Sequence, residues 1–358
     1  MPESSKSGSA GSVRVGLIGC GRIAQLVHLD ALGRVPGLEL VAAAEPVAER
    51  RDEVARRLPG CQMLEDHHQL LALPEVEAVL ISLPNSLHAE VAVSALEAKK
   101  HVYLEKPLAT NTEDGRRVVE AWRQSPCVGM IGFNYRFHPL HQELQRELAR
   151  SRLGTPTLIR TAFTSPPREL PTWKRERASG GGVLLDYASH HIDLLRFLTG
   201  SEVVAVAAQI QSQRTEDDTA SLQLELANGT LVQSYFSTVG VEKDRFEVQG
   251  TGGTLRLDRL GSKKLTFESA SRKPGRLMRA LSVVSSLGEL RGRIPAALSS
   301  GMEPSFDACL ARFATSIRGG ASPTPDLMDG LCSLQVVEAA EESARTQQFV
   351  RLLNPMHS

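Results

Sequence analysis

A glycine loop near the start of the chain limits the possible fold more than any other stretch. Residues 13–18 (VRVGLI) predict a strand, and they lead directly into residues 19–24 (GCGRIA). A helical pattern follows, with Ile23, Leu26 and Ala31 expected on one buried face. A G-x-G-x-x-A loop between a strand and a helix is a fingerprint of dinucleotide binding. The sequence therefore predicts a nucleotide fold in this half of the chain.

The small residues of this loop suit a bound dinucleotide. Gly19 makes the tight turn, Gly21 lets the main chain approach the pyrophosphate, and Ala24 allows the helix to pack closely on the sheet. The helix N-terminus offers free N–H groups and partial positive charge to the phosphates. We expect cofactor contacts from four loop residues: Gly19, Gly21, Arg22 and Ile23.

An acidic residue follows the second predicted strand. Residues 38–44 end at Glu45, where a carboxylate can accept hydrogen bonds from the adenosine ribose hydroxyls. A 2′-phosphate would be repelled there, so Glu45 favours NAD over NADP. Arg50 and Arg51 come soon after, and they either soften this preference or form a solvated helix face. NAD is the predicted cofactor, and NADP stays open.

Polar residues follow two further strands of the same half. Residues 79–83 turn at Pro84 into a helix that Asn85 can cap. His88 in that helix either faces the cofactor or is structural. Residues 102–104 run into Glu105, Lys106 and a proline. Lys106 is either a functional residue of the ligand site or a surface lysine at the end of a strand.

The carboxyl ends of these strands are expected to meet at one sheet edge, where ligands bind in open α/β sheets. A later strand, residues 127–133, brings Asn134 and Arg136 to the same edge. Cofactor contacts are predicted here from Leu83, Pro84, Asn85, His88, Glu105, Lys106 and Asn134.

The periodicity changes in the second half. Strands alternating with helices predict a doubly wound parallel sheet up to residue 135. Strict alternation over residues 220–226, the turn signal Asn228-Gly229, and three more strands to residue 257 predict an antiparallel meander. The predicted fold class is thus α/β plus α+β. It has a Rossmann domain at 13–135 and an open, mainly antiparallel sheet domain at 136–358.

A triple glycine at residues 180–182 precedes a carboxylate and an imidazole, Asp186 and His190. Four residues apart on a helix, these two side chains are expected on one face within reach of each other. A carboxylate beside an imidazole can orient it as a general base. Alternatively, Asp186 caps a helix and His190 is a buried, hydrogen-bonded histidine. Neighbouring residues have no spacing that completes a metal site, so no metal is predicted.

The composition of the chain restricts the classes of binding partner and the cellular compartment that we expect. Lysine plus arginine equals aspartate plus glutamate at 41 each, which gives no case for nucleic-acid binding. The five cysteines are odd in number and scattered, as in reduced, cytoplasmic proteins. No apolar run reaches the length of a membrane span. Residues 1–12 are expected to form a disordered tail.

Residues 270–295 combine arginines with leucines at helical spacing. Such a basic amphipathic segment can lie on an anionic membrane surface or face an acidic substrate such as a nucleotide sugar. It can also simply cover the sheet or make a subunit contact.

Several of these motifs together resemble the glucose–fructose oxidoreductase/inositol dehydrogenase (Gfo/Idh/MocA-like) family. The resemblance rests on the glycine loop, Glu45, Pro84-Asn85 with His88, Glu105-Lys106-Pro107, residues 132–136 (GFNYR), and the triple glycine before Asp186 and His190. It covers residues 13–352. It implies catalysis by Lys106 and His190 with Asp186 in support, and homodimers or homotetramers formed through the outer face of the open sheet.

The resemblance implies an NAD(P)-dependent oxidoreductase that acts on a sugar, cyclitol or sugar derivative. Substrate contacts are then expected from Lys106, Arg136, Trp173, Asp186 and His190; Trp173 either stacks on a sugar ring or belongs to the core. Two alternatives stay open. One is a redox-neutral enzyme of the epimerase, lyase or glycosidase type that uses tightly bound NAD. The other is a non-catalytic NAD-binding regulatory protein.

Overall fold

The computed structural model describes residues 11–270 and 303–352. The predicted tail at 1–12 and the basic segment at 270–295 therefore lie almost entirely outside the described residues. None of the described helices is long and apolar enough to cross a membrane.

The first half of the chain forms a six-stranded, wholly parallel sheet with the order β3-β2-β1-β4-β5-β6. This strand order is that of dinucleotide-binding doubly wound folds, so the predicted Rossmann architecture is confirmed. The strands are β1 (Val13–Ile18), β2 (Leu38–Ala44), β3 (Gln62–Leu64), β4 (Ala78–Ile81), β5 (His101–Leu104) and β6 (Gly129–Ile131).

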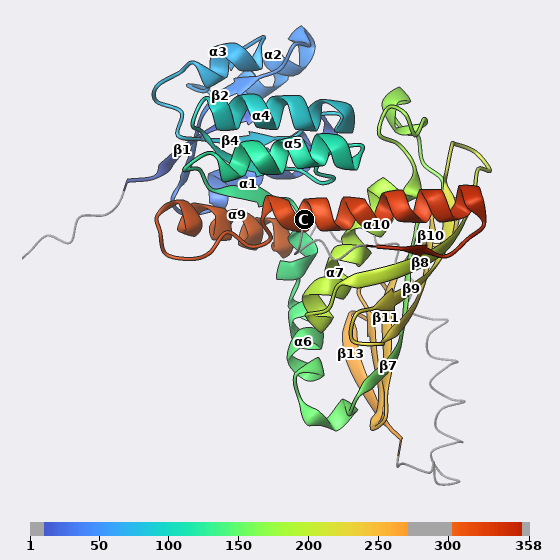
Figure 1. Cartoon of the computed structure of the whole chain (residues 1–358). Helices are drawn as coiled ribbons and strands as arrows, with labels where there is room; N and C mark the ends of the chain where they lie inside the picture. Colours follow the sequence, from blue (N-terminus) through green and yellow to red (C-terminus); the bar gives the residue numbers. More distant parts are fainter. Residues whose placement is uncertain (1–10, 271–302, 353–358) are drawn as a thin grey trace, which may run out of the picture.

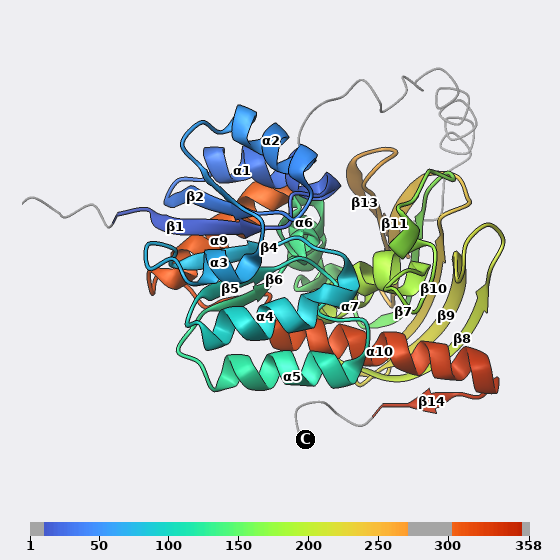
Figure 2. The same cartoon turned by 90° about the horizontal axis from the view of Figure 1, so that it is seen from above.

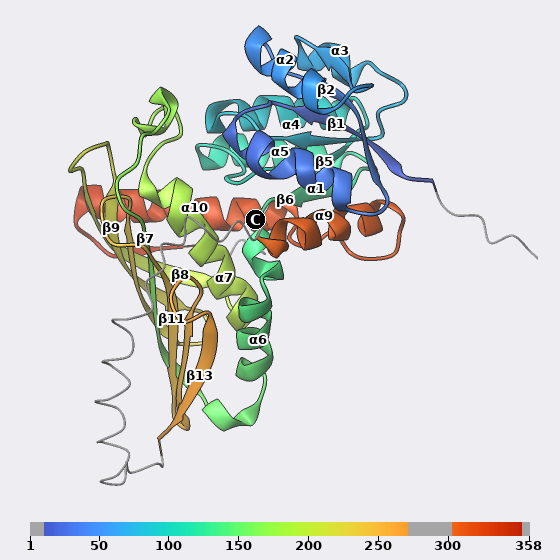
Figure 3. The same cartoon turned by 180° about the vertical axis from the view of Figure 1, so that it is seen from behind.

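Helices cover both faces of this sheet. Two of them, α4 and α5, lie on one face, while α1 lies on the other beside α9, which comes from the end of the chain (Figures 1 and 3). The helical segments of this layer are η1 (Ala24–His28), α1 (Leu29–Arg34), α2 (Ala48–Arg57), α3 (His67–Leu71), η2 (Asn85–Leu87), α4 (His88–Glu97), α5 (Thr112–Arg123) and α9 (Pro304–Ile317).

The buried face predicted for the first helix is wrong in part. Ile23 and Leu26 are exposed, while Ala24 and His28 are buried. The reason is that η1 is a π-helix, whose i→i+5 hydrogen bonds shift the phase of the side chains relative to an α-helix.

The second half forms an eight-stranded sheet with the order β13-β12-β11-β7-β10-β9-β8-β14. Only β7 and β10 pair in parallel, so the prediction of a mainly antiparallel sheet is confirmed. The strands are β7 (Pro156–Thr164), β8 (Val203–Gln211), β9 (Thr219–Leu226), β10 (Leu231–Ser237), β11 (Lys243–Gly250), β12 (Gly253–Asp258), β13 (Lys264–Ser269) and β14 (Val350–Arg351).

Helices α6, α7 and α10 pack on one face of this second sheet (Figures 1 and 2). The long α10 also packs against α5, so one apolar core continues from the first sheet into the second. The helical segments here are η3 (Asn134–Phe137), α6 (Pro139–Leu148), η4 (Ser151–Leu153), η5 (Thr172–Lys174), η6 (Leu184–Ala188), α7 (Ser189–Thr199) and α10 (Leu327–Thr346). This packing carries η6 and α7 to the carboxyl edge of the first sheet.

Candidate active site

The glycine loop after β1 has the shape that a dinucleotide phosphate requires. Gly19 has a φ of +90°, and a Cβ there would lie 2.3 Å from the main-chain oxygen of Ser82. A Cβ on Gly21 would meet no atom within 4 Å, so its main chain stays open to an approaching ligand. Arg22 and Ile23 are exposed beside it. The loop therefore fits a pyrophosphate, as predicted.

Glu45 lies buried against this loop. Its carboxylate accepts hydrogen bonds from the main-chain N–H groups of Cys20, at 2.8 Å, and Val47, at 3.1 Å. The guanidinium of Arg50 lies 3.5 Å from the same carboxylate. Arg51 instead donates to main-chain oxygens and pairs with Glu65, so its side chain is committed to the fold.

The polar side chains after β4 form hydrogen bonds with main-chain oxygens of other loops. Asn85 does not cap the following helix, because its side-chain amide donates to the main-chain oxygen of Gly180 at 2.7 Å. The ring nitrogens of buried His88 lie 2.6 Å from the Pro107 oxygen and 3.0 Å from the Leu83 oxygen. Burial lowers the pKa of His88, so its ring is neutral and can donate to only one of these carbonyls. We assign His88 to holding two loops together rather than to direct cofactor contact.

Two other predicted cofactor residues also have protein partners. Glu105 contacts the Nε2 atom of His28 at 2.8 Å, within the buried end of η1. The side-chain amide of Asn134 donates to the hydroxyl of Ser305 at 2.8 Å. Both residues still lie at the ends of β5 and β6, where the nicotinamide end of a dinucleotide is expected.

A cluster of two lysines and one carboxylate is the centre of the site. The Nζ atom of Lys106 donates to the main-chain oxygen of Asp186 at 2.7 Å and to its carboxylate at 2.9 Å. Lys174 donates to the same carboxylate oxygen at 3.0 Å. Burial alone would raise the pKa of Asp186, but the two ammonium groups hold it well below its usual range. Asp186 is therefore an anion that fixes two cations.

The predicted hydrogen bond between Asp186 and His190 is absent. Asp186 lies in the π-helix η6, where the changed phase breaks the i,i+4 alignment expected of an α-helix. The Nδ1 atom of His190 is buried and has no hydrogen-bond partner among the described residues. Among the described residues, no hydrogen bond therefore lets Asp186 orient His190, and Asp186 acts on the imidazole only through its charge.

Aromatic packing holds the His190 ring instead. Its centroid lies 4.3 Å from that of Tyr135, with an interplanar angle of 20°. The Tyr135 hydroxyl accepts a hydrogen bond from Arg259 at 2.8 Å, and Arg259 donates to Asp244 at 2.7 Å. Burial, followed by the charge of Lys106, lowers the pKa of His190 well below its usual range. His190 is thus a neutral imidazole beside an ammonium group.

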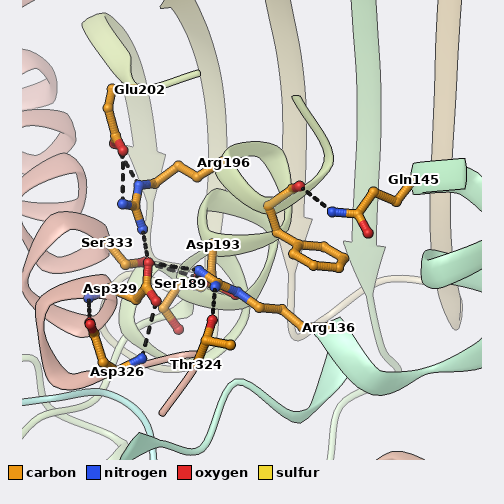
Figure 4. A network of polar contacts seen from close by, with 11 residues as sticks. Arg136, Gln145, Ser189, Asp193, Arg196, Glu202, Thr324, Asp326, Asp329 and Ser333 are labelled. Carbon is orange, nitrogen blue, oxygen red and sulfur yellow. Dashed lines mark hydrogen bonds and ion pairs between the residues drawn. The ribbon is translucent and has the colours of Figure 1, made fainter. Parts of the chain in front are cut away.

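The guanidinium of Arg136, a predicted substrate contact, is paired with carboxylates of the protein itself. Its guanidinium forms two hydrogen bonds with Asp193, at 2.5 and 2.8 Å, and pairs with Asp329 at 2.9 Å (Figure 4). A bidentate, buried pair of this kind fixes the start of α6 and α7 relative to α10.

A small cavity borders the lysine–carboxylate cluster. A cavity of about 10 Å³ lies beside Asp186 and is lined by Lys174 and the triple glycine at 180–182. Trp173 is half-buried, with the Lys174 ammonium 5.4 Å from its ring centroid. Lys174 and Arg259 lie in no recognisable motif, so sequence patterns do not find them; only the position of Lys174 next to Trp173 gives a signal. Tyr135 lies in the GFNYR stretch at 132–136, but no role was predicted for its own side chain.

Among the described residues, one group brings three possible metal ligands together: Asp66, His67 and His68 at the start of α3. The side chain of Asp66 caps the helix through the His68 N–H. This group does not include Asp186 or His190, whose surroundings are lysines and aromatic rings.

Comparison with known proteins places the chain among oxidoreductases. A family model described as "Oxidoreductase family, NAD-binding Rossmann fold" matches residues 13–133, and a GFO/IDH/MocA C-terminal domain model matches residues 141–256. The chain is 31% identical over 351 residues to 1,5-anhydro-D-fructose reductase of Ensifer adhaerens, covering 95% of the chain and 98% of that relative. It is 27% identical to scyllo-inositol 2-dehydrogenase (NAD(+)) of Bacillus subtilis over 95% of the chain and 96% of that protein.

A solved structure shares the whole fold. Levoglucosan dehydrogenase in complex with NADH and levoglucosan superposes with a TM-score of 0.81 at 26% identity, over 95% of this chain and 99% of that one. The likeness extends through both sheets, so the second half belongs to the same architecture as the nucleotide fold.

The position of Glu45 predicts a test of cofactor choice. We expect Glu45→Ser to weaken NAD binding by roughly tenfold or more, because an ionised acceptor for the ribose hydroxyls is lost. NADP binding should weaken less or improve, because Arg50 becomes free to pair with the 2′-phosphate. Dissociation constants for NAD and NADP, measured by calorimetry, give the ratio of the two affinities.

Glu49→Ser removes an exposed carboxylate from the neighbouring helix and serves as the control. An unchanged ratio of NAD to NADP affinity in Glu45→Ser would show that Glu45 only supports the loop.

Proposed function

Because the chain belongs to the GFO/IDH/MocA oxidoreductase family, we propose that it transfers a hydride between NAD and a hydroxyl-bearing or keto carbon of a sugar, cyclitol or sugar derivative. The observation that carries this proposal is the meeting of Lys106, Asp186 and His190 at the carboxyl edge of an NAD-binding sheet. A nucleotide sugar is included among the sugar derivatives.

Bound NAD supplies the hydride acceptor in this reaction. The loop at Gly19 and Gly21 and the carboxylate of Glu45 hold its pyrophosphate and ribose ends. Asn134, Pro84 and Glu105 lie along the edge that leads from there to Lys106. We assign these residues to orienting the cofactor, which leaves the proton chemistry to the lysine and histidine side chains.

Lys106 is suited to hold the reacting oxygen. An ammonium group has three N–H donors, and two of them are used on the main chain and carboxylate of Asp186. The third donor remains for the substrate oxygen, where it stabilises the negative charge that develops as the hydroxyl proton leaves. Asp186 thereby acts on the reaction by positioning Lys106, with Lys174 sharing its carboxylate.

His190 is suited to take the hydroxyl proton. Its Nδ1 atom is enclosed without a partner, so Nε2 is the nitrogen that we assign to the substrate hydroxyl. Its lowered pKa keeps the ring neutral, so one ring nitrogen keeps a free lone pair for the hydroxyl proton as the hydride leaves. Burial raises the pKa of Tyr135, so the tyrosine stays protonated and does not compete as the base.

We further propose a homo-oligomer formed through the outer face of the second sheet. Leu231 and Tyr235 of β10 are 56% and 45% exposed and point to the same side, opposite the packed helices. We also propose a cytoplasmic location, because all five cysteines are free. The division at 135/136 remains our proposed domain boundary.

Substitution of Lys106 and His190 tests the proposal. We expect Lys106→Ala and His190→Ala each to lower kcat at least about 100-fold while NAD still binds, because each removes a proton or charge-stabilising contact. The assay follows reduced cofactor across a panel of sugars, cyclitols and sugar acids. The controls Lys243→Ala and His68→Ala remove an exposed lysine and an exposed histidine.

Wild-type turnover in both variants would rule out these roles. Tightly retained cofactor with product formed but no net reduced cofactor would instead indicate a redox-neutral reaction.

The stack on Tyr135 predicts a change in the pH profile. In Tyr135→Leu the His190 ring becomes more exposed to solvent, so the pKa of His190 should rise towards its ordinary value. The acid limb of the pH profile of kcat/KM should then move to higher pH. Tyr135→Phe keeps the ring and should shift this limb much less. A Tyr135→Leu enzyme with a lower rate but the wild-type profile would show that Tyr135 supports only the fold.

A further inference from the structure

A second cavity lies between α6, η3, α9 and the end of α7. Its volume is about 320 Å³, and its walls include Arg136, Gln145, Arg146, Phe197, Arg312 and Thr324. This size falls within the range of small-molecule pockets, roughly 300–1,000 Å³. None of the residues that line the cavity beside Asp186 takes part in it.

The side chains on one wall of this cavity are held by hydrogen bonds within the protein. The side chain of Gln145 donates to the main-chain oxygen of Phe197 at 2.9 Å, and Arg136 reaches Thr324 at 3.4 Å (Figure 4). The guanidinium of Arg136 lies 5.5 Å from the Phe197 ring centroid and is neutralised by Asp193 and Asp329. This wall therefore combines the Phe197 ring with polar side chains that already have partners within the protein.

The other arginines of the cavity have no such partner. Arg146 donates to a main-chain oxygen of its own helix, and no carboxylate in the described part of the chain pairs with it or with Arg312. No acidic residue lines the cavity. Two guanidinium groups without a carboxylate partner among the described residues thus border a cavity that the Phe197 ring also lines.

We propose that this cavity binds a small phosphate monoester, with the phosphate on Arg146 and Arg312 and the carbon skeleton against Phe197. A guanidinium presents paired N–H donors that match phosphate oxygens, and a dianion balances two such groups. Arg136 stays with Asp193 and forms the floor. The site is independent of the proposed hydride transfer, because it uses no residue of the Lys106–Asp186 cluster.

Calorimetry with phenyl phosphate tests the proposal. This probe has no oxidisable hydroxyl and is titrated into protein saturated with NAD, so that the phosphate-binding loop is already filled. Inorganic phosphate and phenol are titrated at the same ionic strength. We expect saturable binding of phenyl phosphate, weaker binding of inorganic phosphate, and no binding of phenol.

Variants locate the binding. We expect Arg146→Gln/Arg312→Gln to raise the Kd for phenyl phosphate at least about tenfold, because charge-assisted contacts are lost, with intermediate values for the single variants. The control Arg116→Gln/Arg123→Gln removes two exposed arginines from α5. Its Kd should equal that of the wild type.

Three results would overturn the proposal: no saturable binding, equal Kd values in all proteins, or an equal loss in the control. Sedimentation velocity of the same variants tests whether a second copy of the chain, rather than a phosphate monoester, occupies this cavity. Dissociation of an oligomer in Arg146→Gln/Arg312→Gln, with unchanged affinity for phenyl phosphate, would assign these arginines to a subunit interface instead.

Discussion

The site depends on one largely enclosed carboxylate shared between two lysines. Asp186 joins Lys106, at the end of a strand of the first sheet, to Lys174, the last residue of η5. Loss of one lysine would leave the other still paired with this carboxylate, whereas loss of both would leave, among the described residues, only Arg168 near it, at 3.7 Å. The ion pairs therefore fix the position of η6 and α7 on the nucleotide fold. They also keep the Lys106 ammonium aimed at the place where substrate and cofactor meet.

Two π-helices set the geometry around this cluster. The first, η1, follows the glycine loop and brings His28 to Glu105. The second, η6, carries Asp186 and ends directly before α7. Because a π-turn shifts the phase of all later side chains, Asp186 turns towards the lysines and His190 stacks on Tyr135. Buried ion pairs and aromatic rings, rather than a carboxylate–imidazole bond, hold the base.

The sequence allowed the sheets to be predicted more accurately than the contacts. Strands with clear boundaries, such as Val13–Ile18 and Leu38–Ala44, were identified to the residue because apolar runs ended at glycine or an acid. The motifs also identified the residues that meet at the sheet edge. The contact between Asp186 and Lys174 was not predictable, since π-turns have no sequence signature and Lys174 ends a single short 3₁₀ turn without periodicity. The pairing of Arg136 with Asp193 and Asp329 was not predictable either, because these partners lie far along the chain.

We conclude that burial and the charge of Lys106, without a hydrogen bond to Asp186, keep His190 neutral. The most direct measurement is the ¹⁵N chemical shift of the His190 imidazole, assigned with His190→Gln, in a titration from about pH 8 to about pH 5.5. We expect the chemical shifts of a neutral ring throughout, because burial and Lys106 lower the pKa of His190 well below its usual range. A titration with a midpoint at or above the ordinary histidine pKa of about 6.5 would contradict it.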